Sequence, residues 1–183
     1  KEAVEVMNVH SRASAGDIGG IQNTVGNEKQ EKIIDNFLNQ SNQVKKVVVD
    51  DIEFSRAELF LKKAILLHKS AIRNEDESKL AEAFALLEKA KALEPANIEI
   101  LLEMAKILVV LTPDDPTDEE AILEQIELLF QSPKDDETAF YLAQARYMLA
   151  TSNIKHIDED LLRKAKNTFH LLGHAHMVAD CDE

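Results

Sequence analysis

Apolar side chains recur every three or four residues through most of the chain after residue 55, which is the period of an α-helix. In residues 81–95, AEAFALLEKAKALEP, one helix face carries Ala83, Leu87 and Ala90, and a second apolar face begins beside it at Leu86. A helix on a protein surface needs only one apolar stripe, so a helix with two is expected to lie between two neighbours. The small alanines indicate that one of these neighbours approaches closely.

The same period predicts further helices on both sides of this stretch. They are RAELFLKKAILLHKSAIRN, IEILLEMAKILVVL, DEEAILEQIELLF, ETAFYLAQARYMLA and EDLLRKAKNTFHLL, at residues 56–74, 98–111, 118–130, 137–150 and 159–172. Ser55 with Glu58, and Thr117 with Glu120, have the spacing of a capping box, and Gly173 suits a left-handed helix end. All four prolines fall between the periodic stretches. The main body is therefore expected to be all α, built of antiparallel helix pairs.

The N-terminal part of the chain has a different composition. Residues 1–30 hold four of the five glycines and show no periodicity, which predicts a flexible or irregular lead-in. Residues 31–54 are expected to form a short helix and a connection, and the β-branched run at 44–54, VKKVVVDDIEF, is interpreted as part of that connection or as a helical turn. The predicted helical repeat domain covers residues 55–176, and residues 177–183 are a C-terminal tail.

Composition and charge bear on the kind of partner and on the cellular compartment. The formal net charge of -13 disfavours a nucleic-acid partner, because phosphate backbones are bound by clustered Lys and Arg. No run approaches the roughly 20 apolar residues of a membrane helix, so no membrane partner is expected. A single cysteine, Cys181, excludes an internal disulfide and suits a reducing compartment, the cytoplasm or nucleus. The first ten residues lack the apolar centre of a signal peptide and start with Lys1 rather than Met, which suits a piece of a longer chain.

A repeat is visible in the positions of alanine and proline. Pro95 and Pro133 each end a helix twelve residues after an alanine, Ala83 or Ala121, and the two prolines lie 38 residues apart. This arrangement resembles the tetratricopeptide repeat, a helix hairpin with small and large apolar residues on its first helix and Ala, an aromatic residue and a closing Pro on its second. The first match is Ala83, Leu87, Ala90 and Pro95, with Leu87 in the aromatic slot. The second is Leu101, Met104, Ala105, Leu108, Ala121 and Pro133, and the third is Ala139, Leu142, Ala143, Arg146, Ala165, Phe169 and Leu172.

The resemblance implies an α-solenoid of about three antiparallel hairpins. The chain departs from the family because the turns TPDDPT and TSNIKHIDED, at 112–117 and 151–160, are longer than its usual turn within a hairpin. The third repeat also has no closing proline. Another right-handed α-solenoid and an irregular helical bundle are the alternatives.

The resemblance also implies a function, which is the binding of a partner peptide or helix in a concave groove lined by the first helix of each hairpin. The positions that match the groove of the family are Glu99, Leu102, Lys106, Val109, Val110, Glu137, Phe140, Gln144, Tyr147 and Met148. Some family members clamp acidic C-termini, but only Lys106 fits that role here, so an apolar or basic partner segment is expected. The alternative is that several of these residues are core, in a structural or oligomerisation domain whose groove is filled by its own N-terminal segment.

The sequence does not favour metal binding or catalysis. A zinc site would draw on the C-terminal residues His170, His174, His176, Asp180 and Cys181, but Gly173 is expected to end the helix between the first two histidines, and no established zinc motif is present. The acidic stretch PDDPTDEE has the wrong spacing for a calcium loop and suits a helix N-terminus. No nucleophile, base and orienting group stand at informative spacings. We therefore expect a binding module that is not an enzyme and uses no cofactor or metal.

Overall fold

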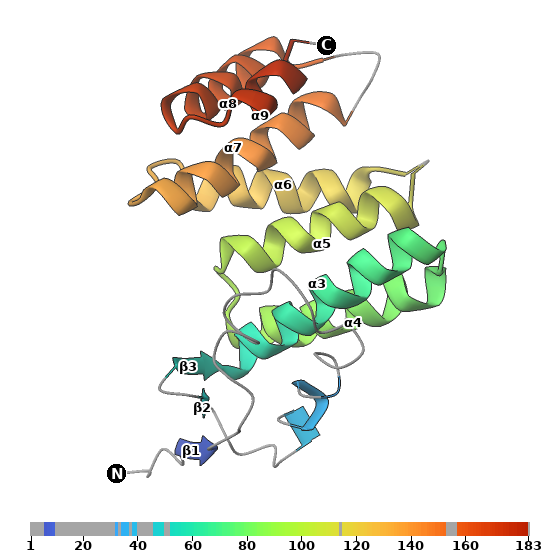
Figure 1. The fold of residues 1–183 in the computed structure, drawn as a ribbon. Helices are drawn as coiled ribbons and strands as arrows, with labels where there is room; N and C mark the ends of the chain where they lie inside the picture. The colour runs from blue at the N-terminus through green and yellow to red at the C-terminus, as the bar shows by residue number, and fades with distance from the viewer. Residues whose placement is uncertain are drawn as a thin grey trace. The chain divides into compact units, whose positions relative to one another are not determined.

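A computed structural model describes residues 6–9, 32, 34–36, 38–39, 46–49, 52–113, 115–152 and 157–182 (Figure 1). Most of these residues are helical, which confirms the predicted all-α character of the main body. The chain divides into two compact units, Lys1–Pro95 and Ala96–Glu183, so the predicted domain at 55–176 is split at Pro95. Each unit is described separately. Among the described residues, no helix has both the length and the apolar character needed to cross a bilayer.

The first unit is centred on a hairpin of two helices, α3 (Arg56–Asn74) and α4 (Glu77–Leu93). The capping box predicted at the start of α3 is present: the Ser55 hydroxyl accepts a hydrogen bond from the Glu58 amide at 3.1 Å, and the Glu58 carboxylate accepts one from the Ser55 amide at 2.5 Å. Helix α3 ends at Glu75, which takes a left-handed conformation with φ 53°. Asp76 then caps α4, so the chain reverses within two residues.

Ala83 and Ala90, the small residues from which a close neighbour was predicted, are buried in this hairpin. Ala83, Leu87 and Ala90 are each 0% exposed, which confirms the first of the two predicted faces. Leu86 on the second face is also buried, whereas Leu93 near the helix end is exposed. Helices α3 and α4 pack along their length, and side chains of one carbon let two backbones meet at short range.

Replacing Ala90 by leucine is expected to lower the free energy of unfolding by about 1 to 3 kcal/mol, because the added carbons have no space in a fully packed contact. Ala92 lies on the same helix and is exposed, so Ala92→Leu is the matched control and should change stability little. Urea denaturation followed by circular dichroism measures both changes. Equal stability of the two variants would contradict the close packing at Ala90.

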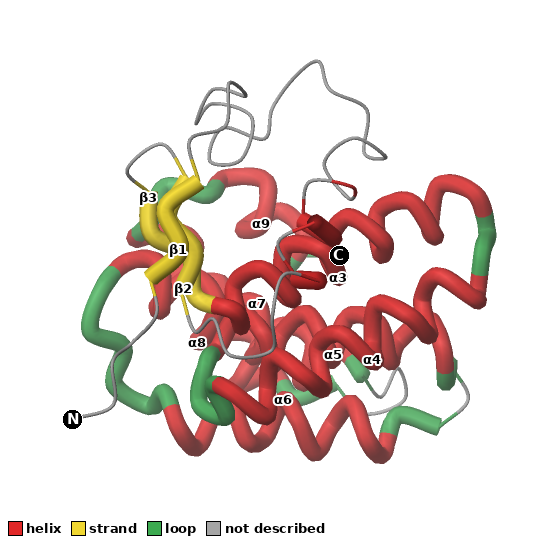
Figure 2. Tube along the Cα trace, turned by 90° about the horizontal axis from the view of Figure 1, so that it is seen from below, coloured by secondary structure: helices red, strands yellow, loops and turns green. Residues whose placement is uncertain are grey.

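A small sheet accompanies the first hairpin and corrects one prediction (Figure 2). Strand β1 (Val6–Val9) pairs in parallel with β2 (Lys46–Val49), which pairs antiparallel with β3 (Ile52–Ser55). The interpretation of residues 44–54 as a connection or helical turn was therefore wrong, and part of the segment 1–30 that was expected to be irregular forms a strand. The β-branched run favours extended backbone once a partner strand supplies hydrogen bonds, and one partner comes from far away in the sequence.

The short helix expected after residue 30 is seen at residues 32, 34–36 and 38–39, while Ile33 and Phe37 lie outside the described residues. Polar contacts fix this segment to the first hairpin. The Lys63 ammonium group lies 2.7 Å from a carboxylate oxygen of Asp35 and 3.3 Å from one of Glu82. Arg56 donates a hydrogen bond to the carbonyl of Leu38 at 3.2 Å.

The second unit contains the helices α5 (Ile98–Leu111), α6 (Thr117–Leu129), α7 (Asp136–Thr151), α8 (Glu159–Leu171) and α9 (Ala175–Asp180). Helix α5 packs on α6, α7 contacts both of them, α8 packs on α7, and α9 packs on α8. The first four helices lie where the periodicity predicted them. Figure 1 shows their succession from yellow-green to red.

One predicted cap is absent. Thr117 and Glu120 do not form a capping box, since Pro116 occupies the cap position and no side chain caps the helix. Asp115 instead accepts hydrogen bonds from the Thr117 hydroxyl at 2.6 Å and from the Thr117 amide at 3.2 Å. Glu120 accepts a hydrogen bond from the Ser152 hydroxyl at 2.9 Å. Thr117 is thus bonded to the Asp115 carboxylate, and Glu120 to Ser152, instead of to each other in a capping box.

The predicted left-handed end of α8 is confirmed, because Gly173 has φ 78° and the following amide, of His174, bonds back to the carbonyl of Phe169 at 2.9 Å. The predicted tail at 177–183 is not simply a tail, since α9 spans its first half. The short helix covers a buried cluster that we call the C-terminal core. Its members are Ala143, Ala165, Phe169 and Cys181, with Phe140, Tyr147, Leu162, Met177 and Val178 packed against them.

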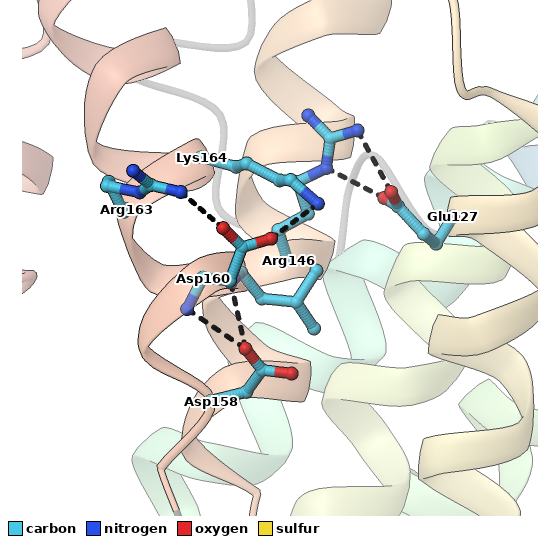
Figure 3. A network of polar contacts seen from close by, with 7 residues as sticks. Glu127, Arg146, Asp158, Asp160, Arg163 and Lys164 are labelled. Carbon is cyan, nitrogen blue, oxygen red and sulfur yellow. Dashed lines mark hydrogen bonds and ion pairs between the residues drawn. The ribbon is translucent and has the colours of Figure 1, made fainter.

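An ion pair joins α6 to α7 (Figure 3). The Arg146 guanidinium donates two hydrogen bonds to the Glu127 carboxylate, at 2.7 and 3.0 Å. Both side chains are partly buried, so solvent screens this bidentate pair less than an exposed one. At the start of α8, by contrast, Asp160 pairs with Arg163 and Lys164 on an exposed surface, where ion pairs contribute little.

Candidate functional site

The predicted groove residues of α5 differ in exposure and do not form one continuous exposed surface. Leu102 is 1% exposed, so the prediction that it contacts a partner was wrong; α5 is buried on more than one face, and Leu102 belongs to the core. The Lys106 Nζ lies 3.6 Å from the Glu103 Oε2, so the two side chains form an ion pair within the helix. Val109 and Val110 are exposed near the C-terminal end, about 15 Å of helix rise from Glu99.

The predicted residues of α7 do not share one environment. Glu137 and Phe140, in the N-terminal half of the helix, line an open pocket. Tyr147 packs against the C-terminal core, which agrees with the alternative that some of these residues are core. Gln144 is partly buried, and its side-chain oxygen is buried with no hydrogen-bond partner, while Met148 is partly buried.

The pocket, which we call the α7–α8 pocket, has a volume of about 760 Å³. It lies between the N-terminal half of α7 and the end of α8 with the turn that follows. The lining side chains that matter below are Asp136, Glu137, Phe140, Tyr141, Leu171 and His174. Of these, Leu171 is 84% exposed, although it is a large apolar side chain. Of this set, only Glu137 and Phe140 were predicted from the sequence to contact a partner.

Aromatic rings form one side of the α7–α8 pocket. The Phe140 ring lies edge-on to Phe169 of the C-terminal core, with centroids 5.9 Å apart. It also contacts Tyr141 at 6.0 Å and the His174 imidazole at 4.5 Å. Because Phe140 touches both the core and the pocket, packing of the core holds this wall in position.

A tyrosine and two carboxylates form the polar side of the site. The Tyr141 hydroxyl donates a hydrogen bond to Glu137, one turn earlier on α7, at 3.5 Å, and it also interacts with Glu99 of α5. Burial raises the pKa of Tyr141, and the negative charges of Glu99 and Glu137 raise it further. The two carboxylates therefore make this side of the site negative around a partly buried phenol.

The residues considered for zinc do not assemble into a ligand set. Among the residues that the structure describes, no group of three or more His, Cys, Asp or Glu side chains is placed to hold a metal ion. His174 contacts the Phe140 ring, and the Cys181 thiol is buried in the C-terminal core. Burial raises the pKa of this thiol, which disfavours the thiolate that binds metals.

A second, smaller pocket lies in the first unit. Its volume is about 410 Å³, and it is formed where the segment at 34–39 meets α3 and α4. Its charged side chains include Asp35, Lys63 and Glu82, which already form ion pairs with one another. Its charges are thus largely compensated, whereas those of the α7–α8 pocket are mainly negative.

Tyr141, Leu171 and His174 were not predicted from the sequence as partner contacts, and His174 was considered only as a zinc ligand. Tyr141 stands four residues after Glu137, a spacing that places both on one helix face, and this signal was available. The approach of Glu99 and the exposure of Leu171 depend on how the helices pack. Comparison of the chain with models of protein families, with characterised proteins and with solved structures gives no match.

Proposed function

We propose that this chain is a protein-interaction module of tetratricopeptide-like hairpins that binds a segment of a partner protein in the α7–α8 pocket. The order of helix contacts in the second unit supports the repeat. The pairs α5 with α6 and α7 with α8 each form a hairpin, and the first helix of the later hairpin contacts both helices of the earlier one. Stacked helical repeats bury their apolar faces through such neighbour contacts.

The observation that carries the binding proposal is the position of Leu171. This side chain is 84% exposed at the edge of a pocket whose volume suits a ligand of several side chains. Ligand sites are typically concave and lined mainly by apolar and aromatic side chains, and Phe140, Leu171 and Leu172 supply such a lining here. The acidic residues around the pocket favour a partner segment that combines apolar and basic residues.

The segment at 34–39 favours a second candidate function. It is fixed to the first hairpin by Asp35 and by the Leu38 carbonyl, so the chain does place part of its own N-terminal region on a helix pair. A structural or oligomerisation domain that covers its own apolar surface is therefore the alternative.

Selection from a library of displayed random peptides tests the proposed function. The intact chain is expected to enrich peptides that share an apolar residue next to a basic one, and Leu171→Asp should reduce this enrichment about tenfold or more, because a charge replaces the apolar contact. Leu93→Asp, at another exposed leucine outside the pocket, is the control and should leave enrichment unchanged. Enrichment that is equal for both variants, or absent for the intact chain, would contradict binding at this pocket.

A further inference from the structure

We propose that the α7–α8 pocket recognises an arginine side chain of the partner segment, with the guanidinium beside Glu137, Glu99 and Tyr141 and a neighbouring apolar side chain on Leu171. This inference rests on the proposed function and names the chemistry that the site selects.

The charge around the pocket favours a cationic ligand. Asp136 and Glu137 line it, Glu99 reaches the Tyr141 hydroxyl, and none of the described lining residues is a Lys or Arg. The neighbouring cation in the preceding turn, Lys134, acts on the Asp135 carboxylate, which caps α7. A positively charged group that enters the pocket therefore meets carboxylates that its own charge would compensate.

The arrangement of donors and acceptors favours arginine among cations. Glu99 and Glu137 both act on Tyr141, and a phenol has one hydrogen to donate. Both carboxylates lie near the same phenol, and a guanidinium offers five N–H groups in a plane that can contact more than one acceptor. The Tyr141 and Phe140 rings, 6.0 Å apart, add aromatic surface on which a guanidinium stacks.

The apolar part of the site favours an apolar residue next to the arginine in the ligand. Leu171 is almost fully exposed, and Leu172 beside it also lines the pocket. An apolar side chain next to the arginine would remove Leu171 from water, which favours binding.

An anionic ligand is the main competitor, because α7 begins at the pocket and helix N-termini attract anions. The cap position is already occupied by the Asp135 carboxylate, which accepts a hydrogen bond from the Thr138 amide at 2.7 Å. Asp136 and Glu137 add two more negative charges in the first turn. An incoming anion would face these charges, so the helix end is compensated by the chain itself.

Titration with two blocked dipeptides tests the proposal. The probes are N-acetyl-Leu-Arg-amide and N-acetyl-Leu-citrulline-amide, which have nearly the same shape but differ in charge. Binding to the intact chain is followed by the NMR signals of the two tyrosine rings, of which Tyr141 is in the pocket and Tyr147 serves as internal reference. We expect the arginine probe to shift Tyr141 signals and to bind about tenfold more tightly than the citrulline probe, the factor for one charge-assisted hydrogen bond.

Two variants test whether the preference for the charged probe depends on Glu137. Glu137→Gln is expected to weaken binding of the arginine probe about tenfold and to leave the weaker citrulline binding unchanged. Glu124→Gln is the matched control, because it removes the same charge from an exposed position of α6 outside the pocket. Equal binding of both probes, no shift of Tyr141 up to about 10 mM arginine probe, or equal weakening by the two variants would overturn the proposal. The proposed function fails separately, when the peptide selection shows no dependence on Leu171.

Discussion

Phe169→Ala is expected to lower the free energy of unfolding of the Ala96–Glu183 unit by about 3 to 5 kcal/mol, the range for truncating a buried phenylalanine. Phe169 is 0% exposed and lies at the centre of the C-terminal core. Its removal leaves a cavity between α7 and α8 and deprives α9 of its main apolar support. A loss of this size is a large fraction of the stability of a typical domain.

The loss is not expected to be uniform over the unit. Helix α9 has only six residues and no side-chain cap, so its stability depends on packing against the C-terminal core. Hydrogen exchange of amides in α9 should therefore increase most in the variant, before that of α5 and α6. The same substitution also removes the ring that holds Phe140, so the wall of the α7–α8 pocket should become mobile.

Urea denaturation measures the overall loss, and Leu171→Ala is the control. Leu171 lies on the same helix but is exposed, and its truncation should change the free energy of unfolding by about 0.5 kcal/mol or less. A change below about 1 kcal/mol for Phe169→Ala would contradict the central position of this ring.

Leu87→Ala is expected to destabilise the Lys1–Pro95 unit by about 2 to 5 kcal/mol. Leu87 is 0% exposed, between the buried alanines of α4, and the small side chains around it cannot expand into the space that it leaves. A rigid cavity costs more than one that its surroundings can fill, so the upper half of the range is expected.

Leu93 provides the comparison for this second truncation, because it lies on the same helix and is 52% exposed. Leu93→Ala should cost well under 1 kcal/mol in the same denaturation experiment. If both truncations cost the same, Leu87 would not be in the tight contact between α3 and α4.

The strong periodicity of the sequence was enough to place the helices of the main body. The ends of some of these helices are set by contacts within a few residues, such as the Ser55 capping box or the left-handed Gly173, which a sequence pattern can indicate. The buried face of Ala83, Leu87 and Ala90 was predicted for the same reason. The solenoid arrangement and the choice of partner are proposals, since they depend on more than local pattern.

Only the tertiary structure decided the remaining features, and each of them joins residues that are distant in the sequence. Strand β1 joins the sheet by pairing with β2, which lies about 40 residues later in the sequence. Leu102 became core, although its place on the helix suited a groove, because α5 is covered on more than one face. Glu99 came to lie beside Tyr141 because α5 contacts α7. Helix period fixes which residues share a face, but packing between helices determines which faces remain open to a partner.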